Sequence, residues 1–131
     1  MSPAAEKRLL QTAILLVLVV PLSAGMLGAS GGPDWLHRGL VGRDLDSHFR
    51  YLSGLLLAMA LLFASCVPNV EAKGTRLRLL AILPVIGGLA RLYGVVAIGP
   101  PGRGHVVALF IELGIVPLLV LWQARLARRF T

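Results

Sequence analysis

The chain has a single cysteine, Cys66, and few charged or aromatic residues. One cysteine cannot form an internal disulfide or a CxxC pair, which excludes the quinone-linked thiol oxidoreductases. Charged residues make up 15% of the sequence, against roughly 25% in soluble domains. Aromatic residues make up only 6%, and no basic stretch interleaves with them. The net charge of +7 therefore does not indicate nucleic-acid binding.

What the sequence has instead is apolar residues, at 56% of the chain, in four long runs. The runs cover about residues 9–29, 47–67, 76–98 and 104–123, and a helix of about 20 residues crosses a bilayer core. We expect an all-α fold, an integral membrane four-helix bundle, forming a single transmembrane domain over residues 1–131. The competing interpretation of the first run is a signal peptide cleaved near Ser23 and Gly25. The apolar run continues to Ala29, which favours a span.

The longest predicted loop runs from Ser30 to Leu45. Gly31, Gly32 and Pro33 end the first helix, and residues 33–38 are predicted to form a short interfacial helix, with Trp35 and Leu36 in the interface. A lid over a pocket is the alternative for this segment. The second span is predicted to begin with Asp46 or Ser47 as its N-cap.

The distribution of lysine and arginine predicts the topology. Eight of the thirteen lie near the N-terminus, the turn at Lys73 or the C-terminus, all on one side of a four-span bundle. Because basic residues concentrate on the cytoplasmic side, both termini are expected to be cytoplasmic, in the bacterial inner membrane.

Two opposite charges lie inside apolar sequence on either side of a tight turn. Arg91 precedes the end of its span by about seven residues, and Glu112 follows the start of the next by about eight. The turn Gly99-Pro100-Pro101-Gly102 makes these two helices antiparallel neighbours. Both side chains then lie roughly 10–12 Å below the same non-cytoplasmic edge, which predicts an ion pair.

Further polar residues are expected at the same edge. Asp46 and Arg50, spaced i, i+4, share one helix face and can pair. The predicted ligand-binding residues are Asp46, His48, Arg50, Arg91, His105 and Glu112, and the opposite half of the bundle is expected to hold almost no charge.

Three other roles compete for these residues. The Arg91–Glu112 pair can simply hold two helices in register, or Glu112 can carry a proton. His48 and His105 can bind a metal with Asp46 and Glu112, but no HxxxH or Cys/His cluster supports this. No catalytic residue, metal or cofactor is predicted.

The chain resembles a known family in three stretches: residues 45–54, residues 87–92, and Glu112 with Pro117, Trp122 and Gln123. It is similar to the small bacterial four-span membrane proteins of domain-of-unknown-function family 4345. The resemblance implies a four-helix integral membrane protein, and it assigns no activity because the family has no established function. The leading hypothesis is a non-enzymatic protein that binds a membrane lipid or small amphiphile in a polar pocket in the non-cytoplasmic half. The alternatives are an accessory subunit, packing against another membrane protein or a second copy, and an intramembrane enzyme.

Overall fold

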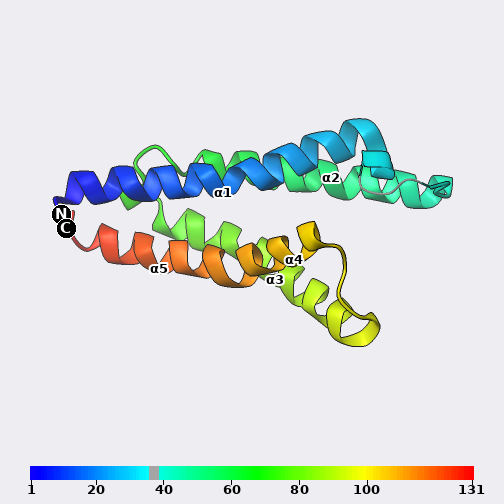
Figure 1. Cartoon of the computed structure of the whole chain (residues 1–131). Helices are drawn as coiled ribbons and strands as arrows, with labels where there is room; N and C mark the ends of the chain where they lie inside the picture. Colours follow the sequence, from blue (N-terminus) through cyan, green and yellow to red (C-terminus); the bar gives the residue numbers. More distant parts are fainter. Residues whose placement is uncertain (36–38) are drawn as a thin grey trace. The chain divides into compact units, whose positions relative to one another are not determined.

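The computed structural model describes residues 1–35 and 39–131, which are all-α and contain no strand. This confirms the predicted fold class. The elements, in chain order, are the α-helices and short η segments of Figure 1: α1 Pro3–Gly31, η1 Gly32–Trp35, α2 Arg43–Ala64, η2 Val70–Ala72, α3 Gly74–Ile98, α4 Arg103–Phe110, η3 Ile111–Ile115 and α5 Val116–Ala127. Of the short segments, η1 and η2 are 3₁₀ helices and η3 is a single π turn.

Four helical stretches in the described part of the chain are long and apolar enough to cross a membrane: Pro3–Asp34, Arg43–Ala64, Gly74–Ile98 and Arg103–Ala127. Many of their large apolar side chains point outward. Leu16, Leu61, Ile86 and Phe110 each expose more than half of their surface. Water does not tolerate so much contiguous apolar surface, whereas acyl chains do.

The chain forms two compact units. We call residues Met1–Ile14 and Cys66–Thr131 the terminal unit, and residues Leu15–Ser65 the hairpin unit. The terminal unit holds the start of α1 and all elements from η2 to α5. The hairpin unit holds the rest of α1 with η1 and α2.

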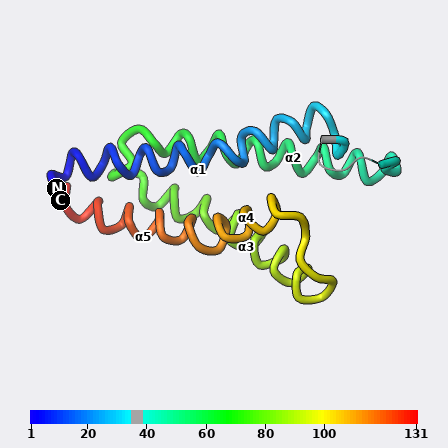
Figure 2. The backbone as a smooth tube through the Cα atoms, in the orientation of Figure 1, coloured from blue at the N-terminus to red at the C-terminus, as the bar shows by residue number. Residues whose placement is uncertain are grey.

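In the terminal unit, α3 packs against α4, η3 and α5, and η2 packs against α5. The chain reverses direction after α3 and returns through α4, as the yellow-to-orange part of the tube shows (Figure 2). Gly88 allows the close approach of the returning helix, because a Cβ there would lie 2.9 Å from the Cβ of Glu112. The two termini lie side by side, and Arg129 Nη2 donates to the carbonyl oxygen of Met1 at 3.1 Å.

In the hairpin unit, α1 and α2 approach closely at two glycines. A Cβ on Gly25 would lie 2.8 Å from the backbone nitrogen of Leu57, and one on Gly28 would collide with the side chain of Ser53. Beyond α1, Gly32 adopts a φ of +69°, a left-handed conformation that a glycine adopts without strain. This turns η1 onto α2.

Helix boundaries differ from the expected ones in two places. The first helix begins at Pro3, so Glu6 and Lys7 are helical. The N-cap prediction at Asp46 or Ser47 is wrong, because α2 begins at Arg43 after the cap residue Gly42. Asp46 lies inside the first turn, where its amide donates to Gly42 O at 3.0 Å and its charge complements the helix dipole.

Part of the predicted interfacial helix is present as η1, which ends at Trp35. Residues 36–38 and the side chain of Trp35 lie outside the described part of the structure, and with them the expected insertion of Trp35 and Leu36 into the interface.

The last span is interrupted by the π turn η3, a feature that apolar periodicity did not predict. Pro117 has no N–H to donate to the carbonyl four residues earlier. Instead, the amide of Val116 donates to Ile111 O, five residues earlier, which is the π pattern. The turn contains Glu112, and π turns inside helices often lie at functional sites.

Candidate ligand-binding site

The predicted ion pair between Arg91 of α3 and Glu112 of η3 is confirmed. Arg91 Nε donates to Glu112 Oε2 at 3.1 Å, and Nη2 donates to Oε1 at 3.2 Å. Two parallel bonds of this kind fix the planes of both groups relative to each other. The side chains are 30% and 18% exposed, so the pair lies at the edge of the packed helices.

His105, near the start of α4, completes this cluster. Its Nδ1 lies 2.9 Å from Arg91 Nη1. An arginine guanidinium carries only donors, so Nδ1 must be the acceptor and the neutral ring carries its proton on Nε2. The three contacts involve three of the five N–H groups of Arg91, and no acceptor among the described residues takes the other two.

An open groove of about 600 Å³ lies beside this cluster, in the terminal unit. Arg91 and His105 supply its polar wall. The remaining lining is small or apolar, from the end of α3 and the turn that follows: Gly94, Val95, Ile98, Gly99, Pro100 and Pro101. A groove with one polar side and apolar walls suits a molecule that is itself amphiphilic.

Asp46 and Arg50 form the other predicted pair, within the hairpin unit. Arg50 Nε donates to Asp46 Oδ2 at 2.8 Å, as the i, i+4 spacing predicted. Arg50 Nη1 donates to Ala29 O at 3.2 Å and to Ser30 O at 2.7 Å. These carbonyls end α1 and have no helical partner of their own, so Arg50 closes the helix end. His48 is exposed on α2.

The six predicted residues thus form two groups of three. Arg91, His105 and Glu112 contact one another in the terminal unit. Asp46, His48 and Arg50 belong to the hairpin unit, where Asp46 and Arg50 are in contact and His48 is not hydrogen-bonded to either. That the residues of the hairpin unit bind a ligand stays a prediction. Their arginine, Arg50, already donates to two carbonyl oxygens at the end of α1.

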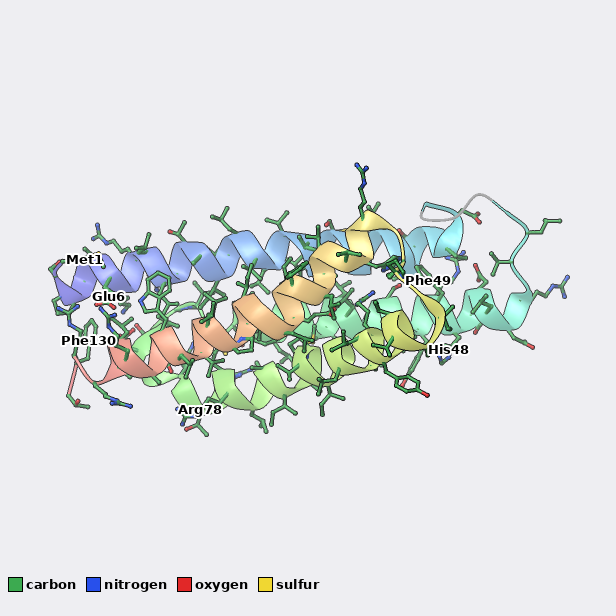
Figure 3. All side chains as sticks on the ribbon, turned by 60° about the horizontal axis from the view of Figure 1, so that its bottom comes forward. Met1, Glu6, His48, Phe49, Arg78 and Phe130 are labelled. Atoms are coloured by element: carbon green, nitrogen blue, oxygen red, sulfur yellow. The ribbon has the colours of Figure 1, made fainter. Side chains whose placement is uncertain are left out.

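Sequence reasoning missed a buried acid near the N-terminus. The Glu6 side chain is only 1% exposed. Its Oε1 accepts from the indole Nε1 of Trp122 at 3.1 Å and lies 3.5 Å from Arg125 Nη2, while Oε2 accepts from Arg129. Figure 3 shows Glu6 beside Met1 and Phe130, at the end of the terminal unit where the chain begins and ends.

A second set of contacts joins η2 to the same end. Lys7 Nζ donates to Glu71 Oε1 at 2.8 Å. Burial of the Glu71 carboxyl acts to raise its pKa, but the hydrogen bond and positive charge of Lys7 outweigh this and hold the pKa below its ordinary value. The fully buried Gln123 donates from Nε2 to Val70 O at 2.9 Å and to Glu71 O at 3.2 Å.

These contacts correct the expectation that the half of the bundle opposite Arg91 holds almost no charge. The hydropathy boundary at residue 9 placed Glu6 and Lys7 in the flank, whereas they lie in the first turns of α1 and contact η2 and α5. The available signal was the spacing of Trp122, Gln123, Arg125 and Arg129 at the end of the last span. These residue types at a helix end suit a buried acid, although nothing in the sequence names that acid.

A sequence pattern known from serine hydrolases occurs at the end of α1. Residues 28–32 match the GxSxG pattern of serine hydrolases, but Ser30 lies in the last turn of α1 and donates to Met26 O at 2.7 Å. The nucleophile of those enzymes lies instead on a strand-to-helix turn. Among residues 1–35 and 39–131, no three His, Cys, Asp or Glu side chains come together in a way that could hold a metal ion.

The four apolar stretches and their outward-facing side chains define a multi-pass membrane protein. The family model described as Domain of unknown function (DUF4345) matches residues 9–123, which include every residue of both polar groups. The chain belongs to this family, as the resemblance indicated. No curated protein and no solved structure is significantly similar to it.

Proposed function

We propose that this protein binds a membrane lipid or small amphiphile in the groove beside Arg91 and His105. The observation that carries the proposal is the polar wall of that groove. Arg91 is fixed by Glu112 on one side and by His105 on the other, and two of its N–H groups remain for a ligand. A phosphate or carboxylate oxygen is their natural acceptor.

The place of the groove in the fold supports a ligand from the bilayer. Arg91 lies seven residues before the end of α3, which is about 10 Å of helix. The groove therefore extends from the depth of Arg91 to the turn at Gly99–Pro101, where a polar head and the start of an acyl chain would meet. A charged side chain at such depth is costly unless it is paired, and it often serves a function.

The proposal includes an orientation. Eight basic residues belong to the end of the terminal unit that holds both termini: Lys7, Arg8, Lys73, Arg76, Arg78, Arg125, Arg128 and Arg129. Positive charge concentrates on the cytoplasmic side of bacterial inner-membrane proteins. Both termini are then cytoplasmic, and the groove opens in the opposite leaflet.

Two glycines of α3 provide a matched test. Gly94 lines the groove and Gly87 does not, and a Cβ at either position would meet no atom within 4 Å. Gly94→Leu places a side chain in the groove, and its Cβ meets neither Arg91 nor Glu112 within 4 Å. We expect native mass spectrometry of the gently extracted protein to show a retained lipid or amphiphile in the wild type and in Gly87→Leu, and its loss in Gly94→Leu. Equal retention in the two variants, or none in the wild type, contradicts the proposal.

An accessory subunit is the second candidate, and the same glycines favour it. Gly87 and Gly94 lie seven residues apart, on one face of α3, with open space above both. Small residues at such spacing allow another transmembrane helix to approach closely. Under this alternative both leucine variants release a partner chain in the same mass spectra, whereas lipid binding predicts an effect of Gly94→Leu alone.

A further inference from the structure

A second groove lies on the terminal unit, between α3 and α5, and has no part in the site at Arg91. Its volume is about 390 Å³. Its walls are apolar apart from one arginine, Arg78: the lining residues are Arg78, Ala81, Ile82, Val85, Ile86, Pro117, Val120 and Leu121. A groove on a membrane protein with a single charge at one end resembles an acyl-chain site with a place for the headgroup.

Helical spacing puts a second arginine at the same end. Arg78, Ile82 and Ile86 follow at i, i+4, i+8 on one face of α3. Pro117, Leu121 and Arg125 have the same spacing on α5. The start of α3 lies against the end of α5, since a Cβ on Gly74 would lie 2.7 Å from Gln123 Oε1. Arg78 thus lines one end of the groove, and Arg125 follows the lining residue Leu121 by one helical turn on α5.

The charge at this end is not balanced by the protein. Arg78 donates to the neutral Thr75 Oγ1 at 3.3 Å, and Arg125 is 73% exposed while lying 3.5 Å from Glu6. Glu6 already binds Arg129, so one carboxylate faces two arginines. Arg78, which lines the groove, has no carboxylate partner among the described residues, and Arg125 shares its carboxylate with Arg129.

The length of the groove fits one leaflet. From Arg78 to Ile86 the helix rises about 12 Å, and half of a hydrocarbon core is about 15 Å. Arg78 lies in the second turn of α3, near the end of the predicted span, where a headgroup phosphate is expected.

We propose that this groove is a specific site for an anionic glycerophospholipid, with one acyl chain between α3 and α5 and the phosphate held by Arg78 and Arg125. Zwitterionic lipids are weaker ligands because their own positive group cancels the attraction to the two arginines. This site is separate from the groove beside Arg91, because the two grooves share no lining residue and lie toward opposite ends of α3.

The test is a lipid titration of the delipidated full chain in detergent, read by native mass spectrometry. Phosphatidylglycerol and phosphatidylcholine of equal chain length are the probes, with inorganic phosphate as competitor. We expect phosphatidylglycerol to bind more tightly, and Arg78→Gln to weaken it about fivefold, since each basic residue near a membrane surface contributes about that factor. The matched control is Arg76→Gln on the same helix, two residues away and so on the other side, which should change binding little.

A second pair of variants tests the chain site without altering charge. Ile82 lines the groove and Leu83 does not, and their exposures are similar, at 50% and 53%. We expect Ile82→Trp to reduce phosphatidylglycerol binding and Leu83→Trp to leave it unchanged. Neither tryptophan variant alters the groove beside Arg91. A lipid that is lost in Gly94→Leu and retained in Ile82→Trp therefore belongs to the groove beside Arg91.

Four results would overturn the proposal. Equal binding of the two lipids removes the headgroup preference. Equal losses in Arg76→Gln and Arg78→Gln point to diffuse surface charge. Full competition by inorganic phosphate shows that the arginines bind the free anion without the chain. A change of oligomeric state in Ile82→Trp, with lipid binding intact, shows that a second copy of the chain occupies the groove.

Discussion

The guanidinium of Arg91 and the carboxylate of Glu112 bind each other through two hydrogen bonds, of 3.1 and 3.2 Å, across the turn that joins α3 to α4. Their equal depth follows from the sequence, because each lies a similar number of residues from the same turn. That the two side chains face each other depends on two further features. Glu112 packs beside Gly88, and the π turn contains Glu112.

A double-mutant cycle tests the energetic coupling of this pair. Glu112→Gln and Arg91→Leu should each lower the stability of the protein in detergent by about 1–3 kcal/mol, since each leaves a charged partner unmatched. The double variant should be more stable than the sum of the two losses predicts, and thermal unfolding in detergent measures all four proteins. Strictly additive losses would mean that the two side chains are not coupled.

The contact between Arg91 and His105 predicts the tautomer of the imidazole. Because Arg91 can only donate, Nδ1 of His105 should be unprotonated and Nε2 protonated in the neutral ring. The ¹⁵N chemical shifts of the ring, measured by NMR at a pH where the histidine is neutral, distinguish the two tautomers.

The same spectra contain an internal control, since the exposed His48 makes no such contact. In Arg91→Leu the tautomer preference of His105 should relax, while the shifts of His48 should not change. A protonated Nδ1 in the wild type would show that the contact with Arg91 does not form.

Two glycines of the hairpin unit should respond differently to substitution by alanine. A Cβ at Gly25 would lie 2.8 Å from Leu57 N and 2.9 Å from its Cα, and neither backbone atom can move away cheaply. We expect Gly25→Ala to destabilise the protein by about 1–3 kcal/mol through separation of α1 and α2. Thermal unfolding in detergent measures the loss.

Gly54 is the matched control, because it lies inside α2 and a Cβ there would meet nothing within 4 Å. Gly54→Ala should be neutral or should stabilise by about 0.5–1 kcal/mol, since alanine restricts the unfolded chain. A similar loss of stability in both variants would contradict the prediction, because the loss at Gly25 could then not be assigned to the close approach of α1 and α2.

The pairing of Lys7 with Glu71 should make the stability of the protein depend on pH in the acidic range. In the folded protein the pKa of Glu71 lies below 4.5, the ordinary value of a glutamate carboxyl group. The stabilisation is therefore complete above pH 4.5 and is lost as the pH falls through the folded pKa. We expect the difference in unfolding temperature between the wild type and Glu71→Gln to be largest near neutral pH and to shrink below pH 4.5.

Lys7→Met controls for the origin of this effect, since it keeps the helix and removes the charge that lowers the pKa. Its unfolding temperature should fall less steeply with acid than that of the wild type. A constant difference between the wild type and Glu71→Gln across this range would exclude a contribution from the pair.

The sequence predicted the parts of this protein that depend on local composition. Long apolar runs require helices in a membrane, because lipid offers no partner for free backbone groups. The i, i+4 spacing of Asp46 and Arg50, and the symmetric placement of Arg91 and Glu112 about one turn, were sufficient to predict both ion pairs. His105 was correctly grouped with Arg91, although its direct contact and its tautomer were not predicted.

The parts it missed depend on segments that are distant in the chain. Glu6 was assigned to a polar flank because hydropathy counts residues one by one, whereas its burial requires Trp122, Arg125 and Arg129 from the other end of the chain. The role of Arg50 at the end of α1 depends likewise on two carbonyls some twenty residues earlier.

What composition and spacing established, then, is that four apolar helices cross a bilayer and that opposite charges on consecutive helices meet. Which donors of each arginine find no acceptor among the described residues was decided by tertiary structure alone. The reason is physical: hydropathy is a property of the segment itself, while the number of free donors depends on every acceptor that the fold brings within reach.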